Sequence, residues 1–241
     1  SPDGTHIVFF EIHDISWVSL NDVLLARSSK SHTEIAESLH SPDQQSWATV
    51  GLSDNYLCAA SNSSSQTTFV LCNLTAKHYE QVGLLNKASC DHGNCTAVAV
   101  CRERHTSAVI IVYAAETRDE GSKDRAVFWF EQTTAPREGV SRPTPTRLKL
   151  HHKLSGEIKD LRVSADGRYV SIVEQTTSGS VQVKITIRVH TWDLWRNKER
   201  YILETSPDRT GSARSVFTSI VHLSDQPGFI LIMQESEVKI F

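Results

Sequence analysis

Short runs rich in β-branched and aromatic residues, separated by clusters of Ser, Asn, Asp and Gly, follow one another along the whole chain of 241 residues and predict an all-β fold. A turn similar to Ser-x-Asp-Gly recurs before these runs, at 1–4, 52–55, 164–167 and 223–226. Units that recur in this way cannot each bury their own apolar faces and must stack on their neighbours. We therefore expect a β-propeller of four-stranded antiparallel blades, with about five blades in view or an incomplete part of a larger ring.

Each expected strand is one of these apolar runs, bounded by turn-forming residues. In chain order the strands cover 6–12, 15–20, 22–26, 47–52, 56–60, 68–74, 79–84, 96–101, 108–114, 126–131, 146–151, 158–163, 169–174, 181–190, 200–204, 215–223, 229–234 and 237–241. They group into a single domain, 1–241, with blades at 1–27, 46–85, 95–152, 157–205 and 213–241 and a polar insertion at 28–45. Within the insertion Ile35, Ala36 and Leu39 stand at helical spacing, which predicts a turn or two of helix over 33–39.

The two end groups each lack a strand. The first group begins with what looks like the second strand of a blade, and the last group ends with what looks like a third strand. A propeller is a closed ring, whereas an unpaired outer blade leaves strand edges that invite aggregation. We expect either more chain beyond these ends or a ring closed by strands from both termini.

The third strand of the fourth group ends in Val-His-Thr-Trp-Asp-Leu at 189–194, followed by Lys198, and the second group carries Phe-Val-Leu-Cys-Asn-Leu at 69–74, followed by Lys77. The Trp-Asp ending resembles that of a WD40 repeat, so the chain is similar to a divergent WD40-type propeller. No Gly-His dipeptide opens a blade, and Thr-Ser-Gly-Ser at 177–180 stands where such repeats usually place an Asp. The resemblance therefore implies that the buried Asp-His-Ser/Thr-Trp network is absent and that apolar packing holds the blades.

The composition is that of a folded chain, with a formal net charge of -3 and 39% hydrophobic residues. This charge argues against a general polyanion-binding surface, since non-specific affinity for nucleic acid depends on neutralising phosphates. No stretch approaches the roughly 18 apolar residues of a membrane span, so we expect no membrane contact. The odd number of cysteines lacks the even framework of secreted domains and favours an intracellular compartment, cytoplasmic or nuclear.

One cluster has the residue types that zinc prefers, namely Cys90, His92, Cys95, Cys101 and His105. Its spacing is unusual and lacks a second Cys-x-x-Cys pair, so we expect no metal site and no cofactor. The stretch from Cys90 to Cys95 is then a polar loop between blades, and Cys101 lies in the core. If the protein is extracellular, a disulfide between Cys90 and Cys95 is the alternative.

No arrangement typical of nucleophilic catalysis is present, because no Gly-x-Ser-x-Gly occurs and the many serines lie in turn-forming clusters. The repeated acids Asp3, Asp54, Asp166 and Asp225 could serve as ligands or catalytic acids. Their turn positions favour another role, in which each Asp side chain hydrogen-bonds its own backbone and fixes the chain reversal. We therefore expect the protein not to be an enzyme.

The candidate partner contacts are Arg142, Arg147, Lys149, Lys153, Trp195 and Arg196. The first four belong to the stretch 139–156, which contains no acid and which we expect on a loop and an outer strand, where such charges also discourage edge pairing. The last two follow the Trp-Asp pair on a turn, and aromatic and Arg side chains are favoured as interface anchors. The alternative is that Trp195 folds back onto its own blade.

These features favour a non-catalytic, WD40-like scaffold for protein interactions, a subunit of an intracellular multiprotein complex. The polar segments 28–45 and 116–125 are further candidate contact elements. A second hypothesis is a secreted or lectin-like propeller, suggested by glycosylation triplets at Asn62, Asn73 and Asn94. A third is a nucleic-acid-associated subunit that uses the basic stretch. An enzyme would need His, Asp or Glu clustered at inner strand ends, a pattern that the sequence does not show.

Overall fold

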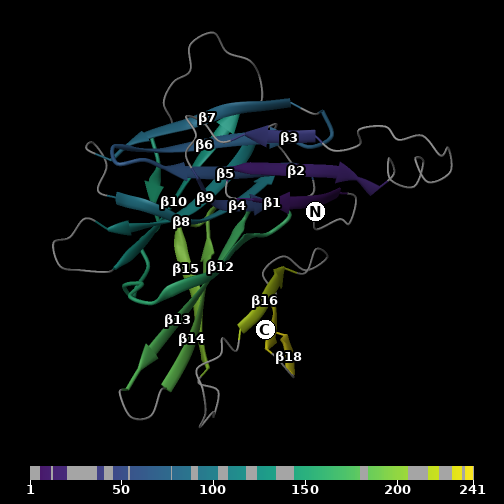
Figure 1. Cartoon of the computed structure of the whole chain (residues 1–241). Helices are drawn as coiled ribbons and strands as arrows, with labels where there is room; N and C mark the ends of the chain where they lie inside the picture. Colours follow the sequence, from purple (N-terminus) through teal and green to yellow (C-terminus); the bar gives the residue numbers. More distant parts are fainter. Residues whose placement is uncertain are drawn as a thin grey trace.

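A computed structural model describes residues 6–11, 13–20, 37–40, 46–53, 55–76, 78–87, 92–102, 108–117, 124–133, 144–179, 184–205, 217–222, 230–234 and 237–240. In these ranges every named element is a β-strand, and the strands form five antiparallel sheets. Figure 1 shows the sheets following one another around the molecule, from the purple first sheet through blue, teal and green to the yellow last sheet. The prediction of an all-β fold is confirmed.

Strand order within each sheet follows chain order, so each sheet is a meander of neighbouring strands. The first sheet contains β1 (His6–Phe10), β2 (Asp14–Ser19) and β3 (Glu37–His40), and the last contains β16 (Phe217–His222), β17 (Ile230–Gln234) and β18 (Glu237–Ile240). The second contains β4 (Trp47–Leu52), β5 (Tyr56–Asn62), β6 (Gln66–Asn73) and β7 (His78–Asn86). The third contains β8 (His92–Arg102), β9 (Ala108–Thr117), β10 (Arg125–Thr133) and β11 (Thr146–Arg147). The fourth contains β12 (Glu157–Val163), β13 (Tyr169–Ser178), β14 (Lys184–Asp193) and β15 (Lys198–Thr205).

The first strands of neighbouring sheets lie against each other, which identifies the architecture. β4 contacts β8, β8 contacts β12 and β12 contacts β16. This is the arrangement of a β-propeller, in which the innermost strands meet around an axis and the outer strands spread apart. The approach of β4 to β8 is so close that a Cβ atom on Gly51 would lie 2.5 Å from the carbonyl oxygen of Val98. Only glycine fits there without a shift of one blade.

The end sheets occupy unequal blade positions. β16 contacts the innermost strand β12, so the last described sheet holds the first three strands of a blade. β1 lacks the extensive contact with β4 that joins the innermost strands of the later blades. The first described sheet therefore corresponds to the second, third and fourth strands of a blade, as predicted, but its last strand is 37–40, within the predicted insertion, and not 22–26.

The prediction of a helix within the insertion is wrong for the part that the structure describes, residues 37–40. Residues 37–40 form β3, which pairs with β2 so that Asp14 lies opposite His40 and Ile15 opposite Leu39. Leu39 is buried in an apolar cluster with Ile15 and Trp47. A short apolar run cannot be assigned from spacing alone, and here the neighbouring strand decides the structure. The described residues do not include the rest of the predicted insertion, 28–36 and 41–45, or the expected strand 22–26.

Apolar side chains fill the spaces between consecutive sheets. Three buried clusters join the first sheet to the second, the second to the third and the third to the fourth. Aromatic rings are central to the second-to-third interface, where Phe69 and Tyr113 have ring centroids 4.9 Å apart and Tyr113 stacks on Phe128 at 5.3 Å. Removal of these faces from water supplies the main attraction between blades.

The Trp-Asp segment closes a defined turn at the end of the fourth blade. Asp193 lies opposite Tyr169, and the amide of Leu194 donates to the carbonyl of Arg168 at 2.8 Å. The Asp193 carboxylate accepts a hydrogen bond from the amide of Arg196, three residues later, at 3.1 Å. An Asp side chain in this position satisfies the backbone donor that the reversal exposes.

The second blade repeats this turn with different residues. Asn73 lies opposite Tyr56, and the amide of Leu74 donates to the carbonyl of Asn55 at 2.9 Å. The Asn73 side-chain oxygen accepts from the amide of Ala76, three residues later, at 3.0 Å. Because the same backbone bonds recur at matched positions, the weak sequence repeat between the two segments reflects a real structural repeat.

The turn before β13 confirms the structural role expected for Asp166. Its carboxylate accepts from the amide of Arg168 at 3.1 Å and from the hydroxyl of Ser164 at 2.5 Å. Gly167 has φ 73°, a left-handed conformation that favours glycine. The other repeated acids, Asp3, Asp54 and Asp225, lie outside the described residues.

Candidate interaction surface

The described part of the basic stretch, 144–156, lies on the outer strand β11 and the chain that follows, although the strand expected over 146–151 covers only Thr146–Arg147. Arg147 belongs to β11, at the outer edge of the third sheet, and both Arg147 and Lys149 are exposed. Lys153 is also exposed, but its ammonium group forms an ion pair with Asp124 at 3.2 Å. Arg142 lies outside the described residues. Part of this positive charge is therefore offset within the third blade.

Trp195 and Arg196 lie on the turn between β14 and β15, and both reach solvent. Trp195 is 54% exposed, and the side chain of Arg196 is 66% exposed. The guanidinium carbon of Arg168 lies 5.1 Å from the centroid of the Trp195 ring, within the range of a cation–π contact. The ring is thus held by its own blade through Arg168 while more than half of its surface stays accessible.

Arg168 is itself fixed by Asp193. Its Nε and Nη2 atoms donate to the same carboxylate oxygen at 3.2 and 2.8 Å, and the Asp193 side chain is 2% exposed. Burial alone would raise the pKa of Asp193, but the hydrogen bonds from Arg168 and from the amide of Arg196 outweigh it and lower the pKa. This charge-assisted pair anchors the turn that presents Trp195.

Charges are sorted by sign between Asp193 and Arg200. The two acids of this stretch, Asp193 and Glu199, are buried, whereas Arg196, Lys198 and Arg200 are exposed. Arg200 places its guanidinium 5.1 Å from the ring centroid of Tyr169, which keeps this cation beside the same turn. The exposed part of the stretch therefore presents only positive charge.

Beneath this surface lies a buried cluster that the sequence did not single out. His190 is 0% exposed and stands between two carboxylates, with Nδ1 2.9 Å from Glu199 Oε1 and Nε2 3.6 Å from Glu174 Oε2. The three residues lie on the adjacent strands β13, β14 and β15. The backbone amides of His151 and Gly156 donate to Glu199 and Glu174 at 2.9 and 2.5 Å.

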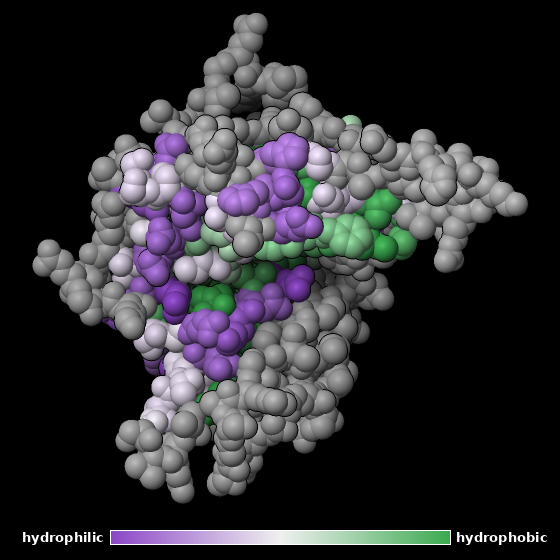
Figure 2. All heavy atoms as spheres, in the orientation of Figure 1, coloured by the Kyte–Doolittle hydropathy of each residue, from purple (hydrophilic) through white to green (hydrophobic). Residues whose placement is uncertain are grey.

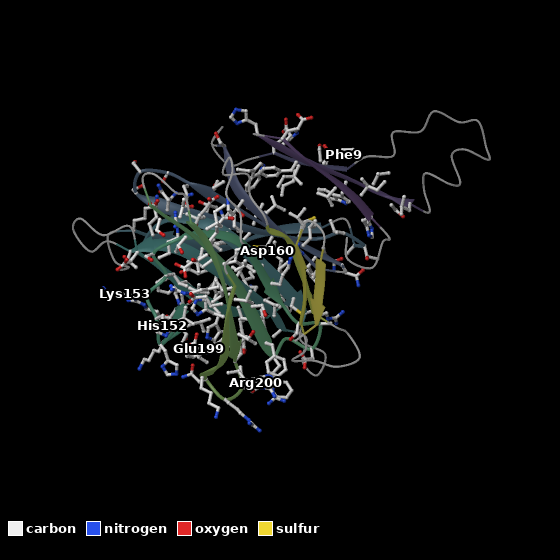
Figure 3. The ribbon with its side chains drawn as sticks, turned by 90° about the horizontal axis from the view of Figure 1, so that it is seen from below. Phe9, His152, Lys153, Asp160, Glu199 and Arg200 are labelled. Carbon is white, nitrogen blue, oxygen red and sulfur yellow. The ribbon has the colours of Figure 1, made fainter. Side chains whose placement is uncertain are left out.

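This buried acid–histidine cluster ties the two predicted contact segments together. His151 and Gly156 belong to the chain that leaves β11 of the third blade and enters β12 of the fourth. Their bonds to Glu199 and Glu174 therefore attach the end of the basic stretch to β15 and β13. Figure 3 shows His152, Lys153, Glu199 and Arg200 along one side of the molecule.

Apolar packing alone does not hold the fourth blade, contrary to what the resemblance implied, because the acid–histidine cluster also joins its strands. Ser171 Oγ and Trp192 Nε1, however, form no hydrogen bond.

The charges of the cluster are mutually stabilised. Burial alone would lower the pKa of His190, but the attraction of the Glu174 carboxylate, 3.6 Å away, and the hydrogen bond to Glu199 outweigh it and raise the pKa above the ordinary 6.5. Burial alone would raise the pKa of Glu174, but the attraction of His190 and the hydrogen bond from the Gly156 amide outweigh it and lower the pKa below 4.5. The arrangement therefore favours a protonated imidazole between carboxylates.

Stability should depend on pH through these two groups. The contribution of Glu174 is present above its ordinary pKa of 4.5 and is lost as the pH falls through the lowered folded value. The contribution of His190 is complete below 6.5 and is lost as the pH rises through the raised folded value. We expect both to be complete between pH 4.5 and 6.5. Urea unfolding across pH measures this profile, and His190→Ala should remove the alkaline loss; identical profiles for the two proteins would contradict the assignment.

The cysteines give no support to a metal site in the described part of the chain. Cys58, Cys72, Cys95 and Cys101 are buried thiols outside any disulfide, and no three or more His, Cys, Asp or Glu side chains among the described residues are arranged to hold a metal ion. Burial raises the pKa of Cys95 to about 12, which keeps this thiol protonated. Cys95 lies within β8 and not in the polar loop expected up to this residue, while Cys90 lies outside the described residues.

Two of the three glycosylation triplets use their Asn side chains to hold the fold. The Asn62 side chain donates to the carbonyl of Cys95 at 2.9 Å and accepts from its amide at 3.0 Å, joining the second and third blades. Asn73 closes the turn described above. Asn94 is exposed and accepts from the buried ammonium of Lys87 at 2.5 Å. A glycan on Asn62 would remove the bond between blades.

Among the described residues, the structure contains no helix with the length and apolar character to cross a membrane.

No protein-family model matches the chain, and no curated protein matches it. Solved structures similar to it include a functionally unknown protein from Desulfotomaculum acetoxidans DSM 771, with 10% identity, coverage of 100% of this chain and 80% of that chain, and TM-score 0.41. A protein from Lactobacillus plantarum has 10% identity, with coverage of 98% of this chain and 78% of that chain, and TM-score 0.42. The Dos1 propeller has 10% identity, with coverage of 100% of this chain and 76% of that chain, and TM-score 0.42. Likenesses this weak carry no function to the chain, and the propeller architecture rests on its own strand order and contacts.

Proposed function

We propose that the chain is a non-catalytic platform for protein interactions, acting within a larger intracellular assembly. The observation that carries this proposal is the turn after β14, where exposed Trp195 stands beside exposed cations on a buried ionic support. Trp and Arg are the side chains most enriched at the centres of protein interfaces. A rigid blade that presents them in one place meets the requirement of a docking site at low entropic cost.

The relation to WD40-type propellers is part of the same proposal. It is supported by Trp192 and Asp193, which end the third strand of a four-stranded blade, and by the matching turn around Asn73 in the second blade. The secreted or lectin-like alternative is less favoured because Asn62 is engaged in the contact between blades. Use of the basic stretch for nucleic acid is less favoured because Lys153 is paired with Asp124.

Affinity purification of the protein at native abundance, with the mass ratio of co-purifying proteins measured, tests the platform role. We expect a partner in near-stoichiometric amount, with chemical cross-links that map to the fourth blade. A protein that elutes without a partner would contradict the proposal, and one that also converts a substrate would be an enzyme.

A further inference from the structure

We propose that the fourth blade binds an extended acidic segment of a partner protein that also places an apolar side chain on Trp195. The binding surface, here called the Trp195 surface, consists of Trp195, Arg196, Lys198 and Arg200. This inference rests on the platform function proposed above and names the chemistry of one of its partners.

Charge complementarity is the first argument. The chain as a whole carries a net charge of -3, yet the exposed side chains of the Trp195 surface are positive. The nearby acids offset this charge only in part, because Asp193 is buried and bound to Arg168, with Arg196 Nε 4.0 Å away, and Glu199 is bound to His190. A partner segment with carboxylates would therefore meet exposed cations, and opposite charges would steer its approach.

Preorganisation is the second argument. Asn197 has φ 48°, a left-handed conformation rare for a residue other than glycine, and it completes the tight turn that projects Trp195. The Asn197 amide donates to the carbonyl of Leu194 at 3.3 Å, and Asp193 holds the amide of Arg196. The backbone of the turn therefore has little conformational freedom left to lose on binding, which makes the exposed ring an effective anchor.

A protein segment fits this surface better than a nucleic acid does. Single strands bind where several aromatic rings offer successive stacking platforms along a basic groove. The other large exposed apolar residues of the described chain, Ile7, Phe9 and Phe10, belong to β1. Figure 2 shows hydrophobic residues gathered over β1, and Figure 3 places Phe9 far from Arg200. Trp195 is thus an isolated ring beside cations, as in an anchor for a peptide.

Fluorescence anisotropy with three labelled probes tests this inference: a peptide of Glu and Phe residues, a matched peptide of Glu and Ser residues, and oligo-dT. We expect the Glu/Phe peptide to bind most tightly and to weaken as salt is raised. The double substitution Arg196→Glu with Lys198→Glu should weaken its binding at least about tenfold, since reversed charges repel the peptide. Trp195→Ala should weaken the Glu/Phe peptide much more than the Glu/Ser peptide.

Arg147→Glu compares the two candidate contact segments, because it reverses an exposed cation of the basic stretch on β11. The inference expects peptide binding to stay nearly unchanged, whereas a loss as large as that of the double variant would place the peptide on the basic stretch and overturn the inference. Circular dichroism verifies that each variant is folded. Equal binding by the double variant would overturn the inference, as would tighter binding of oligo-dT that depends on the same residues. If the native partner still co-purifies with the double variant, the Trp195 surface is wrong but the platform stands. If no partner co-purifies with the unaltered protein, the platform itself fails.

Discussion

Replacement of His190 by alanine should lower the free energy of unfolding by about 3–5 kcal/mol, because removal of one partner from a buried ionic group leaves the others uncompensated. His190 and the side chains of Glu174 and Glu199 are at most 1% exposed, so bulk water does not screen their charges. The two carboxylates would then repel each other in a medium of low polarity. Urea unfolding near pH 6, between the ordinary pKa values of 4.5 and 6.5, measures the effect.

His40→Ala supplies the control for this prediction. His40 also pairs with a carboxylate, that of Asp14, but its side chain is 78% exposed and that of Asp14 is 41% exposed. An exposed pair contributes little, so this substitution should leave the midpoint of unfolding nearly unchanged. Equal effects of the two substitutions would show that the buried acid–histidine cluster does not stabilise the fold.

A double-mutant cycle with Glu199→Gln isolates the attraction within the cluster. Gln keeps an acceptor for the His151 amide and loses the charge, so the single substitution should cost less than His190→Ala. The two changes together should be less harmful than their sum, with a coupling of about 0.5–3 kcal/mol. Additive effects would indicate that His190 and Glu199 contribute independently.

Much of the architecture could be predicted from local sequence, because strand alternation and turn chemistry act over a few residues. The segments ending in Asp193 and Asn73 share no residue at any of their last five positions, yet both close the same turn because Asp and Asn offer the same acceptor oxygen. That each end sheet has three described strands could also be predicted by counting runs. β3 could not, because its assignment depends on pairing with β2.

The buried cluster was missed because its members meet only through strand register. Ile172 lies opposite His190, so Glu174 and His190 fall on the same face of the sheet, and Glu199 joins them from β15. Nothing in the local sequence fixes this pairing. The usable signal was a polar residue at an inward position on two successive strands, Glu174 at the end of one apolar run and His190 within the next. Burial of such polar side chains costs free energy unless they pair with one another.

The contact between the innermost strands should be equally sensitive to volume. Gly51→Ala should lower the free energy of unfolding by about 1–3 kcal/mol, because the added methyl group would meet the backbone of the next blade. Its Cβ would lie 2.5 Å from the Val98 carbonyl oxygen and 2.8 Å from the Ala99 Cα, and neither atom can rotate away. Thermal or urea unfolding measures the loss.

Gly93→Ala distinguishes this steric effect from the general cost of replacing a glycine. The nearest atom to a Cβ on Gly93 is the Glu116 Cβ at 3.3 Å, so a shift of a few tenths of an ångström would relieve the contact. Both glycines lie in strands, and both substitutions reduce the conformational freedom of the unfolded chain equally. The difference between the two unfolding free energies therefore reports the steric clash at Gly51, and we expect Gly93→Ala to cost much less. If Gly51→Ala were as mild as Gly93→Ala, β4 and β8 could not approach as closely as a propeller axis requires, and the radial arrangement of the blades would have to be abandoned.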